Sequence, residues 1–522
     1  MSEDAAALES IADIVRVRAR TCGDKIAIVH DEKRTSYAAL DARSGEVASA
    51  LDTAGIAPGD RVAVLSRNCD TFYDLLAGAA KARACLLPLN VRLSEGELAY
   101  IIDDAQPRLL FVGSGFEDVA ARVVQGCAAP PILVTLDHAY AGWRSRRPQA
   151  PRKRVSQPDD DVLQLYTSGT TGRPKGVVLS NRNLAAVWRM SATVPGFDYR
   201  ADDVVMTVMP QFHVAGINTG LLALHHGAAM VIASDFAPAA LLALIERYRC
   251  TQAFLVPSMI IMLLDHGGLR PDHVASLRQI AYGGSAITGA LLDRARATLG
   301  CDFAQLYGMT ETTGAGTVLS PEEHDRPGKA GSCGRAWPGL EIVAIDEAGC
   351  VLPPGQHGEL VIAGETVMEG YWRQAQATAE ALRPIGLLTG DGGYIDAEGF
   401  VFIEDRIKDI IISGGENIAP SQVEDVLAGY PGVRDVAVIG VPSERWGEAV
   451  KAYIVAEHGA AIDPAAVIAW ARMRLAAYKL PKSIDLIDAI PRNASGKVLR
   501  RQLRDLNQAA AIEASGLGSP AA

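Results

Sequence analysis

The stretch Tyr166-Thr-Ser-Gly-Thr-Thr-Gly-Arg-Pro-Lys-Gly-Val-Val178 contains three glycines, four Ser or Thr hydroxyls and two cations within thirteen residues. Glycine allows the backbone to approach a phosphate group, while hydroxyl and backbone N–H groups donate hydrogen bonds to its oxygen atoms. Lys175 adds a positive charge. The stretch has no Gly-Lys pair followed by Ser or Thr, so it lacks the usual P-loop pattern. It therefore predicts a phosphate-binding loop of a different kind.

The segments on either side of this loop alternate between strand and helix patterns. Short apolar runs at residues 25–30 and 60–66 precede the loop, and similar runs at 203–209 and 229–233 follow it. A capping box at Ser94-Glu-Gly-Glu97 predicts that a helix begins there. Such alternation is typical of a largely parallel sheet with helices on its faces. We therefore predict an α/β fold for the long first part of the chain.

The character of the sequence changes after Phe400. The charged stretch Glu404-Asp-Arg-Ile-Lys-Asp409 precedes a part with α+β character, with strand patterns at 433–441 and 449–456 and a helix pattern at 464–475. The final residues are rich in Ala, Gly and Ser, which is typical of disorder at a terminus. We predict three parts: a large N-terminal domain of stacked α/β subdomains at 1–407, a small α+β C-terminal domain at 408–508 and a disordered tail at 509–522.

The composition is that of a globular protein with an ample core, since 49% of the 522 residues are hydrophobic and 21% are charged. The net charge of −11 disfavours nonspecific binding to nucleic acid or to an anionic membrane. The start of the chain lacks the features of a signal peptide, and no apolar run approaches the roughly 20 residues that span a bilayer. The eight cysteines include no Cys-x-x-Cys pair, which argues against a zinc site or a disulfide framework. We therefore expect a cytoplasmic protein.

Four further motifs follow the loop in the chain. They are Leu306-Tyr-Gly-Met-Thr-Glu311, Thr389-Gly-Asp391, Asp405-Arg-Ile-Lys-Asp409 with Ser413-Gly-Gly-Glu-Asn417, and Pro491-Arg-Asn-Ala-Ser-Gly-Lys497. Each alone is weak evidence, because an isolated carboxylate or lysine is most often a surface residue. Together with the loop, however, they resemble in type and order the signatures of the adenylate-forming superfamily, which includes acyl-CoA synthetases. The resemblance covers nearly the whole chain and is closest to bacterial fatty-acyl-CoA synthetases.

The resemblance implies a site for ATP and Mg²⁺. Thr310 would contact the α-phosphate region, Glu311 would help to hold Mg²⁺, and Tyr307 would stack near adenine. Asp391 would accept hydrogen bonds from the ribose hydroxyls, and Arg406 would reach ribose or phosphate. The other residues expected at the nucleotide are Thr167, Ser168, Gly169, Thr170, Thr171, Gly172, Lys175, Gly284, Ser285 and Gly308.

The resemblance also implies a mobile C-terminal domain. Lys497 would bridge the substrate carboxylate and the α-phosphate, which makes it the foremost catalytic residue. The domain would then rotate about a hinge at Lys408 to expose a narrow tunnel for the pantetheine arm of coenzyme A. Gly414 and Gly415 would line this tunnel, where a side chain would obstruct the passage.

Two more segments match the parts of the family that shape the acyl site. His213 in Pro210-Gln-Phe-His-Val-Ala-Gly216 would lie beside the carboxylate and gate the pocket, while Tyr282-Gly-Gly-Ser-Ala286 would run between adenine and the acyl chain. Most pocket candidates are small or apolar, and none is a cation that could pair with a second carboxylate. This favours a monocarboxylic acid with an apolar body. The pocket candidates are Val214, Ala215, Ile217, Asn218, Thr219, Tyr282, Gly283, Met309, Gly314 and Ala315.

The implied reaction has two steps. Attack of the carboxylate on the α-phosphate of ATP gives an acyl-adenylate and pyrophosphate, and the thiol of coenzyme A then displaces AMP. The first step needs no general base, because a carboxylate is already ionised at neutral pH. It does need concentrated positive charge, because two anions must meet. We expect a medium- or long-chain fatty acid as the substrate.

Several alternatives stay open at this stage. Aryl and alicyclic acid CoA ligases, including 4-coumarate–CoA ligases, share nearly all of these motifs. A free-standing adenylation enzyme would load a carrier protein in place of coenzyme A, and a luciferase-like oxygenase would consume O₂. A catalytically silent binding protein is disfavoured because Lys497, Glu311 and Asp391 are all present. The expected partners are the small carboxylic acid and no nucleic acid, and a homodimer is the candidate assembly.

Overall fold

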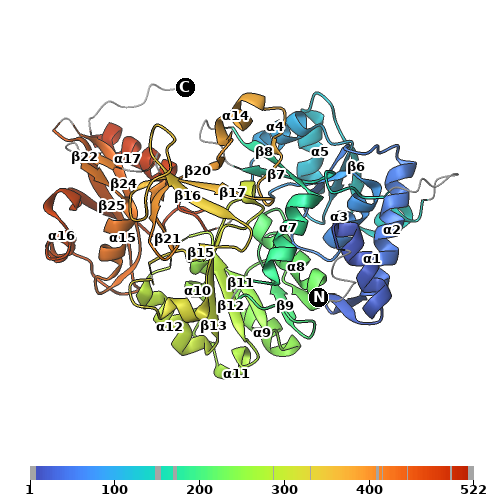
Figure 1. Cartoon of the computed structure of the whole chain (residues 1–522), viewed down its shortest axis with the longest axis horizontal. Coiled ribbons are helices and arrows are strands. Elements are labelled where there is room, and N and C mark those ends of the chain that lie inside the picture. Colours follow the sequence, from blue (N-terminus) through green and yellow to red (C-terminus); the bar gives the residue numbers. More distant parts are fainter. Residues whose placement is uncertain are drawn as a thin grey trace. The chain divides into compact units, whose positions relative to one another are not determined.

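The computed structural model describes residues 8–146, 155–167, 173–194, 196–285, 287–329, 331–406, 409, 411–413, 416–443, 445–493 and 496–514. The chain divides into two compact units (Figure 1). Unit 1 contains Met1–Gly283, Ala295–Ile342 and Val361–Leu388, and unit 2 contains Gly284–Arg294, Val343–Leu360 and Thr389–Ala522. The mixed α/β class with a large first part and a smaller second part is confirmed. The boundary between residues 407 and 408 stays a prediction, because Lys408 lies outside the described residues.

One sheet of unit 1 carries the predicted phosphate loop. Among the described residues it has seven strands in the order β18-β8-β7-β4-β3-β5-β6. The strands from β7 to β6 pair in parallel, whereas β8 and β18 are antiparallel to their neighbours. Their bounds are β3 Arg61–Leu65, β4 Cys85–Pro88, β5 Leu109–Val112, β6 Ile132–Thr135, β7 Asp161–Thr167, β8 Lys175–Ser180 and β18 Gly370–Tyr371. β3, β4 and β5 are buried throughout, as is typical of parallel strands covered on both faces.

Helices between these strands follow the sequence pattern closely. They include α2 (Tyr37–Thr53), α3 (Thr71–Ala82), α4 (Glu95–Ala105) and α5 (Glu117–Gln125). The capping box predicted at Ser94 is confirmed, because the Ser94 side chain accepts from Glu97 N while the Glu97 carboxylate accepts from Ser94 N. α4 then buries Leu98, Ile101 and Ile102 on one face.

The second sheet of unit 1 carries the predicted acyl-site segments. Its nine described strands have the order β15-β14-β13-β12-β11-β9-β10-β1-β2. Pairing is parallel from β13 to β1 and antiparallel at both edges. The bounds are β1 Ile26–His30, β2 Lys33–Ser36, β9 Val204–Thr207, β10 Ala229–Ile232, β11 Gln252–Leu255, β12 Gln279–Gly283, β13 Asp302–Tyr307, β14 Thr317–Leu319 and β15 Arg335–Ala336.

The apolar segment that contains α8 (Val214–His226) also contributes β10 to this region. α8 ends at Gly227, whose φ of +73° lets the chain turn directly into β10. In the part of the chain that the structure describes, no helix combines the length and apolar character needed to cross a membrane.

A third sheet has the order β16-β17-β20-β19, with β21 paired to β20. Its strands are β16 (Glu341–Ile345), β17 (Gly358–Ala363), β19 (Leu382–Arg383), β20 (Gly386–Ile395) and β21 (Val401–Arg406). β20 and β21 form an antiparallel pair in which Asp391 lies opposite Arg406. Two predicted ribose-contacting positions are therefore neighbours across one ladder.

The last part of unit 2 is built on its own sheet, drawn in orange and red in Figure 1. β22 (Ile411–Ser413), β23 (Glu416–Ile418), β24 (Val433–Ser443) and β25 (Gly447–Ala456) are antiparallel, and β26 (Ser483–Leu486) is parallel to β25. α15 (Pro420–Ala428) and α16 (Pro464–Arg472) contribute Val423, Leu427 and Val467 to its core. α17 (Arg500–Ala514) continues past residue 509, where the sequence predicted disorder, because the segment is rich in helix-forming alanine.

Candidate active site

Both arms of the predicted phosphate loop are held in the sheet. Thr167 ends β7 and lies opposite Lys175, the first residue of β8. The Tyr166 hydroxyl donates to the Asp104 carboxylate and accepts from Gln164 Nε2 at 3.2 Å. A Cβ atom at Gly176 would lie 2.8 Å from Gln164 Nε2, so this glycine allows the close packing. Ser168, Gly169, Thr170, Thr171 and Gly172 lie outside the described residues.

Tyr371 joins the loop to the second signature motif. β18 pairs with β8, which places Tyr371 opposite Val177. The Tyr371 hydroxyl donates to Glu311 Oε1 at 3.0 Å, and Lys175 Nζ lies 4.8 Å from the centre of the Tyr371 ring. Lys175 and Glu311 therefore both contact one tyrosine, the first at its ring and the second at its hydroxyl. Tyr371 was not predicted, because nothing in a single sequence marks a two-residue strand as part of a site.

The turn that carries Thr310 and Glu311 depends on glycine. A Cβ atom at Gly308 would lie 2.5 Å from the carbonyl oxygen of Gly314, so no larger residue fits there without a shift of the backbone. Glu311 is 7% exposed, and its carbonyl oxygen accepts from Met368 N at 2.8 Å. A carboxylate is the ligand type that Mg²⁺ prefers. The Glu311 side chain therefore fits the predicted role of metal ligand.

His213 is the N-cap residue of α8. Its Nδ1 accepts from Ala215 N at 3.2 Å, so the neutral ring carries its proton on Nε2. Burial lowers the pKa of His213 to about 4, so the imidazole is neutral at pH 7. A neutral ring with a free Nε2–H can donate a hydrogen bond to a carboxylate without adding a charge.

The segment before His213 is held by Asn68, which the sequence analysis missed. Asn68 Nδ2 donates to the carbonyl oxygens of Val208, Met209 and Ala233 at 3.1 to 3.2 Å, and its Oδ1 accepts from Gln211 N at 2.8 Å. The Gln211 amide in turn bonds both backbone groups of Cys69. The one signal in the sequence was the position of Asn68 just after a buried strand, where parallel sheets place functional loops.

The pocket candidates on α8 lie against the turn that holds Glu311. Asn218 Nδ2 donates to the carbonyl oxygen of Thr313 at 2.6 Å, and a Cβ at Gly314 would lie 3.5 Å from Val214. Val214, Ile217, Asn218, Thr219, Gly283 and Ala315 are buried, whereas Ala215 and Met309 are half-buried. The Tyr282 hydroxyl bonds Gln305 and His324, so its polar end is occupied within the protein.

Three more positions predicted to lie at the nucleotide are at least partly accessible to solvent. Tyr307 is half-buried, Gly284 is exposed with φ of +81°, and Ser285 is half-buried. In unit 2, Asp391 is 7% exposed, and its backbone N–H donates to Thr389 Oγ1 at 3.1 Å. The Arg406 side chain, Lys408, Gly414 and Gly415 are not among the described atoms.

Lys497 sits in a tight turn of unit 2. Arg492 and Val498 form a bridge, and Lys497 and Asn493 exchange two hydrogen bonds of 2.8 Å. Gly496 has φ of +81°, and its carbonyl oxygen accepts from Arg492 at 2.9 Å. The turn explains why glycine precedes the lysine.

Two cations and one aromatic ring form a cluster beside the β22–β23 pair. Arg445 Cζ lies 4.7 Å and Lys482 Nζ 5.8 Å from the Trp446 ring centre. Gly447, the next residue, pairs with Ser413 of β22. Trp446 is 38% exposed, so this cluster, Arg445–Trp446–Lys482, is open to a ligand.

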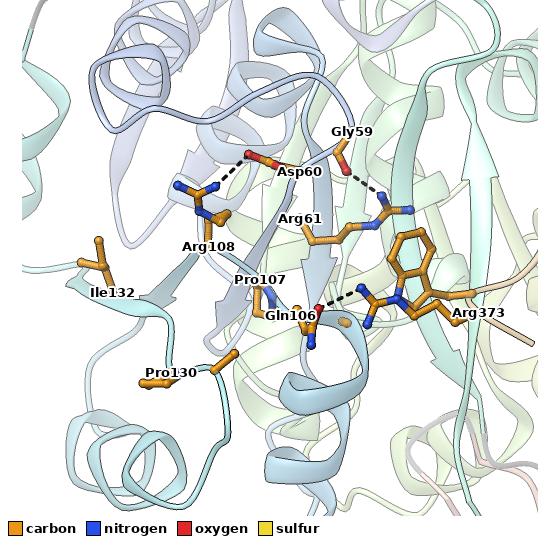
Figure 2. Close-up of a pocket in the computed structure, with 12 residues that line it drawn as sticks. Gly59, Asp60, Arg61, Gln106, Pro107, Arg108, Pro130, Ile132 and Arg373 are labelled. Atoms are coloured by element: carbon orange, nitrogen blue, oxygen red, sulfur yellow. Dashed lines mark hydrogen bonds and ion pairs between the residues drawn. The ribbon is translucent and has the colours of Figure 1, made fainter.

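Unit 1 also contains a cavity of about 610 Å³ that none of the predicted site residues lines (Figure 2). Arg61, Arg108 and Arg373 surround it, and the Arg61 guanidinium lies 3.5 Å from the Trp372 ring centre. Arg61 is already paired with Gln164 and Asp161, and Arg373 with Gln106. The cavity therefore takes no part in the site described above.

Two family models match the chain. The AMP-binding enzyme model covers residues 15–372, and the AMP-binding enzyme C-terminal domain model covers residues 422–497. The chain is 40% identical over 484 residues to the fatty acid–[acyl-carrier-protein] ligase ScoC of Streptomyces coeruleorubidus, which covers 92% of this chain and 93% of the relative. It is 37% identical over 488 residues to a feruloyl-CoA synthase of an Amycolatopsis species, over 93% and 97% of the two chains. The ATP-bound MatB of Rhodopseudomonas palustris matches with a TM-score of 0.86 and 31% identity, over 95% and 99% of the chains.

Proposed function

The chain belongs to the AMP-binding enzymes of the adenylate-forming superfamily and is an ATP-dependent acid–thiol ligase, and we propose that it converts an apolar monocarboxylic acid into its CoA thioester. The observation that carries this proposal is the contact of Tyr371 with both Lys175 and Glu311. It joins the phosphate loop to the predicted metal ligand within one unit. A site of this kind has a cation and a metal-binding carboxylate where a polyphosphate must be held.

In the first step, a carboxylate oxygen of the acid forms a bond to the α-phosphorus of ATP. The bond from this phosphorus to the oxygen bridging to the β-phosphorus breaks, and pyrophosphate leaves with that electron pair. Lys175 and the loop would steady the departing phosphates, and Thr310 would contact the α-phosphate. Mg²⁺, held by Glu311, would supply neutralising charge at the phosphates.

His213 and Lys497 would act on the incoming acid. The neutral His213 ring would donate its Nε2–H to the carboxylate and so orient it. Because the ring carries no charge, the carboxylate would keep its negative charge and its nucleophilicity. Lys497 would bridge the carboxylate and the α-phosphate, where its charge offsets the repulsion between two anions. Asp391 and Arg406 would hold the ribose.

In the second step, the thiol sulfur forms a bond to the acyl carbonyl carbon and AMP leaves. The thiol proton passes to solvent. The hinge would lie at Lys408, and Gly414 and Gly415 would line the tunnel for the pantetheine arm. Rotation of the C-terminal domain would remove Lys497 before this step, a gating motion of the kind known in multistep enzymes.

The Arg445–Trp446–Lys482 cluster supports the proposal that the thiol accepting the acyl group belongs to a molecule with phosphate groups. Its two cations and one aromatic face lie beside the strand pair that flanks the glycine segment. Coenzyme A offers phosphates and an adenine ring to such a surface. A phosphopantetheinyl carrier protein is the second candidate, because the ScoC relative is named for a carrier-protein acceptor. Comparing both acceptors at equal thiol concentration decides between them.

The acid is proposed from the pocket residues. Val214, Ile217 and Ala315 are buried and apolar, and the pocket candidates include no cation for a second carboxylate. A medium- or long-chain fatty acid fits this lining, as the ScoC relative suggests. An aryl or alicyclic acid is the second candidate, because the sequence identity to the feruloyl-CoA synthase relative, 37%, is close to the 40% identity to the ScoC relative. We also propose that the protein is cytoplasmic and forms a homodimer.

The test is a pyrophosphate-release screen of fatty, aromatic and alicyclic acids with ATP, Mg²⁺ and coenzyme A. Acid-dependent release is expected, and Lys497→Ala should abolish it while the variant still folds. Pyrophosphate release that survives this substitution would overturn the role of Lys497. Release from no acid in the screen would overturn the proposed function, and oxygen uptake coupled to the reaction would favour the oxygenase.

A further inference from the structure

The side-chain amide of Asn218 is only half satisfied. Its Nδ2 donates to the carbonyl oxygen of Thr313 at 2.6 Å, whereas its Oδ1 is enclosed and has no hydrogen-bond partner among the described residues. Asn218 is 8% exposed. The short bond to Thr313 fixes the orientation of the amide, because the flipped rotamer would set two oxygens against each other. The unpartnered atom is therefore an acceptor.

This acceptor is unusual within the candidate site. Among the described residues of segments 213–219, 282–285 and 306–315, Asn218 Oδ1 is the only enclosed side-chain oxygen or nitrogen atom without a partner. A Cβ atom at Gly314 would lie 3.1 Å from Asn218 Nδ2 and 3.5 Å from Val214, so the amide lies close to this turn. Buried polar groups in native proteins are nearly always paired, so an orphan of this kind requires an explanation.

The position of Asn218 relates it to the acyl substrate. It lies four residues after Val214 on the same face of α8, and both side chains lie close to Gly314, another pocket candidate. In the proposed function, His213 is placed beside the carboxylate and α8 beside the acyl body. Asn218 would then face the body of the acid, several bonds away from its reacting end.

We propose that the acyl body of the substrate carries an O–H or N–H group that donates a hydrogen bond to Asn218 Oδ1. The inference rests on the proposed function, because that function places the acid against α8. An unsubstituted fatty acid leaves this oxygen unpaired, whereas a hydroxylated aliphatic acid, a phenolic acid or an indole acid satisfies it. A site built to accept a hydrogen bond from a substrate rejects analogues that lack the donor.

The experiment compares acids of one shape that differ only in the donor. The pairs are indole-3-acetate with benzofuran-3-acetate, 4-hydroxycinnamate with 4-methylcinnamate, and octanoates hydroxylated at C4 to C7 with their methyl counterparts. The measurement is kcat/KM for pyrophosphate release by the full chain with ATP and Mg²⁺. In at least one pair the donor-bearing acid should be favoured about tenfold or more. The pair that shows the preference distinguishes an aliphatic from an aromatic source of the donor.

Asn218→Leu removes the acceptor at similar volume and should bring this ratio close to one, mainly by slowing the donor-bearing acid. Thr207→Val is the matched control, because Thr207 also has a buried oxygen without a partner but lies in β9, outside the candidate segments. It should leave the ratio unchanged.

Ratios near one for every pair in the wild-type enzyme would overturn the inference, whether or not the variants fold. A preference that persists in Asn218→Leu would also overturn it, since the donor would then bind elsewhere and a water molecule would occupy the site at Asn218. Release with octanoate or cinnamate in these cases would leave the proposed function standing. No release from any acid would count against the proposed function itself.

Discussion

The Tyr371 hydroxyl donates a hydrogen bond of 3.0 Å to Glu311 Oε1, and this contact links two motifs that are far apart in the sequence. It orients a carboxylate that is 7% exposed. The same ring lies 4.8 Å from Lys175 Nζ, so one side chain positions the expected metal ligand and also contacts the loop cation.

Tyr371→Phe should lower kcat/KM for MgATP about tenfold, because it removes a hydrogen bond to a charged group of roughly 1.5 kcal/mol. Stopped-flow or coupled pyrophosphate assays at varied Mg²⁺ measure the effect, which should appear as a higher Mg²⁺ concentration for the half-maximal rate. Tyr140→Phe is the control, because the Tyr140 hydroxyl is buried and bonds no residue in the described part of the chain. Equal rates for wild type and Tyr371→Phe would show that the hydrogen bond has no role in the reaction.

Gly308→Ala should abolish activity, because its Cβ would lie 2.5 Å from the Gly314 carbonyl oxygen and displace the Thr310–Glu311 turn. Gly142→Ala is the matched control, since a Cβ there meets no atom within 4 Å. Melting temperatures separate a local effect from unfolding. Activity near wild type in Gly308→Ala would mean that the turn tolerates the shift.

His213 should remain neutral throughout the range in which the enzyme is assayed, because burial lowers its pKa to about 4. The ratio of kcat/KM between wild type and His213→Ala should therefore be constant from pH 5.5 to 8.5. A ratio that changes around pH 6.5 would show that the ring titrates at its ordinary value.

The same lowered pKa makes a prediction for stability. An unfolded His213 titrates at about 6.5, so below this pH the unfolded state binds the proton more tightly than the folded state. The stabilisation is complete above pH 6.5 and is lost as the pH falls toward 4. Urea unfolding of wild type and His213→Gln should show a difference in the free energy of unfolding that narrows over this window. A difference that stays constant would contradict the assignment.

Asn68→Ala should cost about 2–3 kcal/mol of stability and should lower kcat more than it raises the KM for ATP. Its amide makes four hydrogen bonds to the backbone of segments near His213. Asn68→Asp should not recover the loss, because a carboxylate oxygen would then face the three carbonyl oxygens that accept from Asn68 Nδ2. If Asn68→Ala changed stability alone and left kcat intact, Asn68 would be structural only.

Much of the fold could be predicted because its strands are short apolar runs between helix patterns. β10 lies within one residue of the run predicted at 229–233. No helix was predicted at α6 (His138–Arg144). Trp143 packs against Phe111 at 4.9 Å, a tertiary contact that a seven-residue helix cannot reveal through periodicity.

The candidate site was predictable only where motifs mark it. Recognisable sequence motifs contain Lys175, Glu311 and His213. Long-range contacts, in contrast, bring Tyr371 and Asn68 to the site. Tyr371 reaches Glu311 because a two-residue strand pairs with β8, and Asn68 reaches the His213 segment from the end of a different sheet. Neither pairing leaves a local pattern in the sequence.

In the first step of the proposed reaction, a carboxylate oxygen attacks the α-phosphorus of ATP. This attack is tested most directly with an acid labelled with ¹⁸O in its carboxylate, incubated with ATP, Mg²⁺ and coenzyme A. Mass spectrometry of the products should find one ¹⁸O atom in AMP and none in pyrophosphate, because the attacking oxygen leaves with AMP. Label in inorganic phosphate, or AMP without label, would contradict the account.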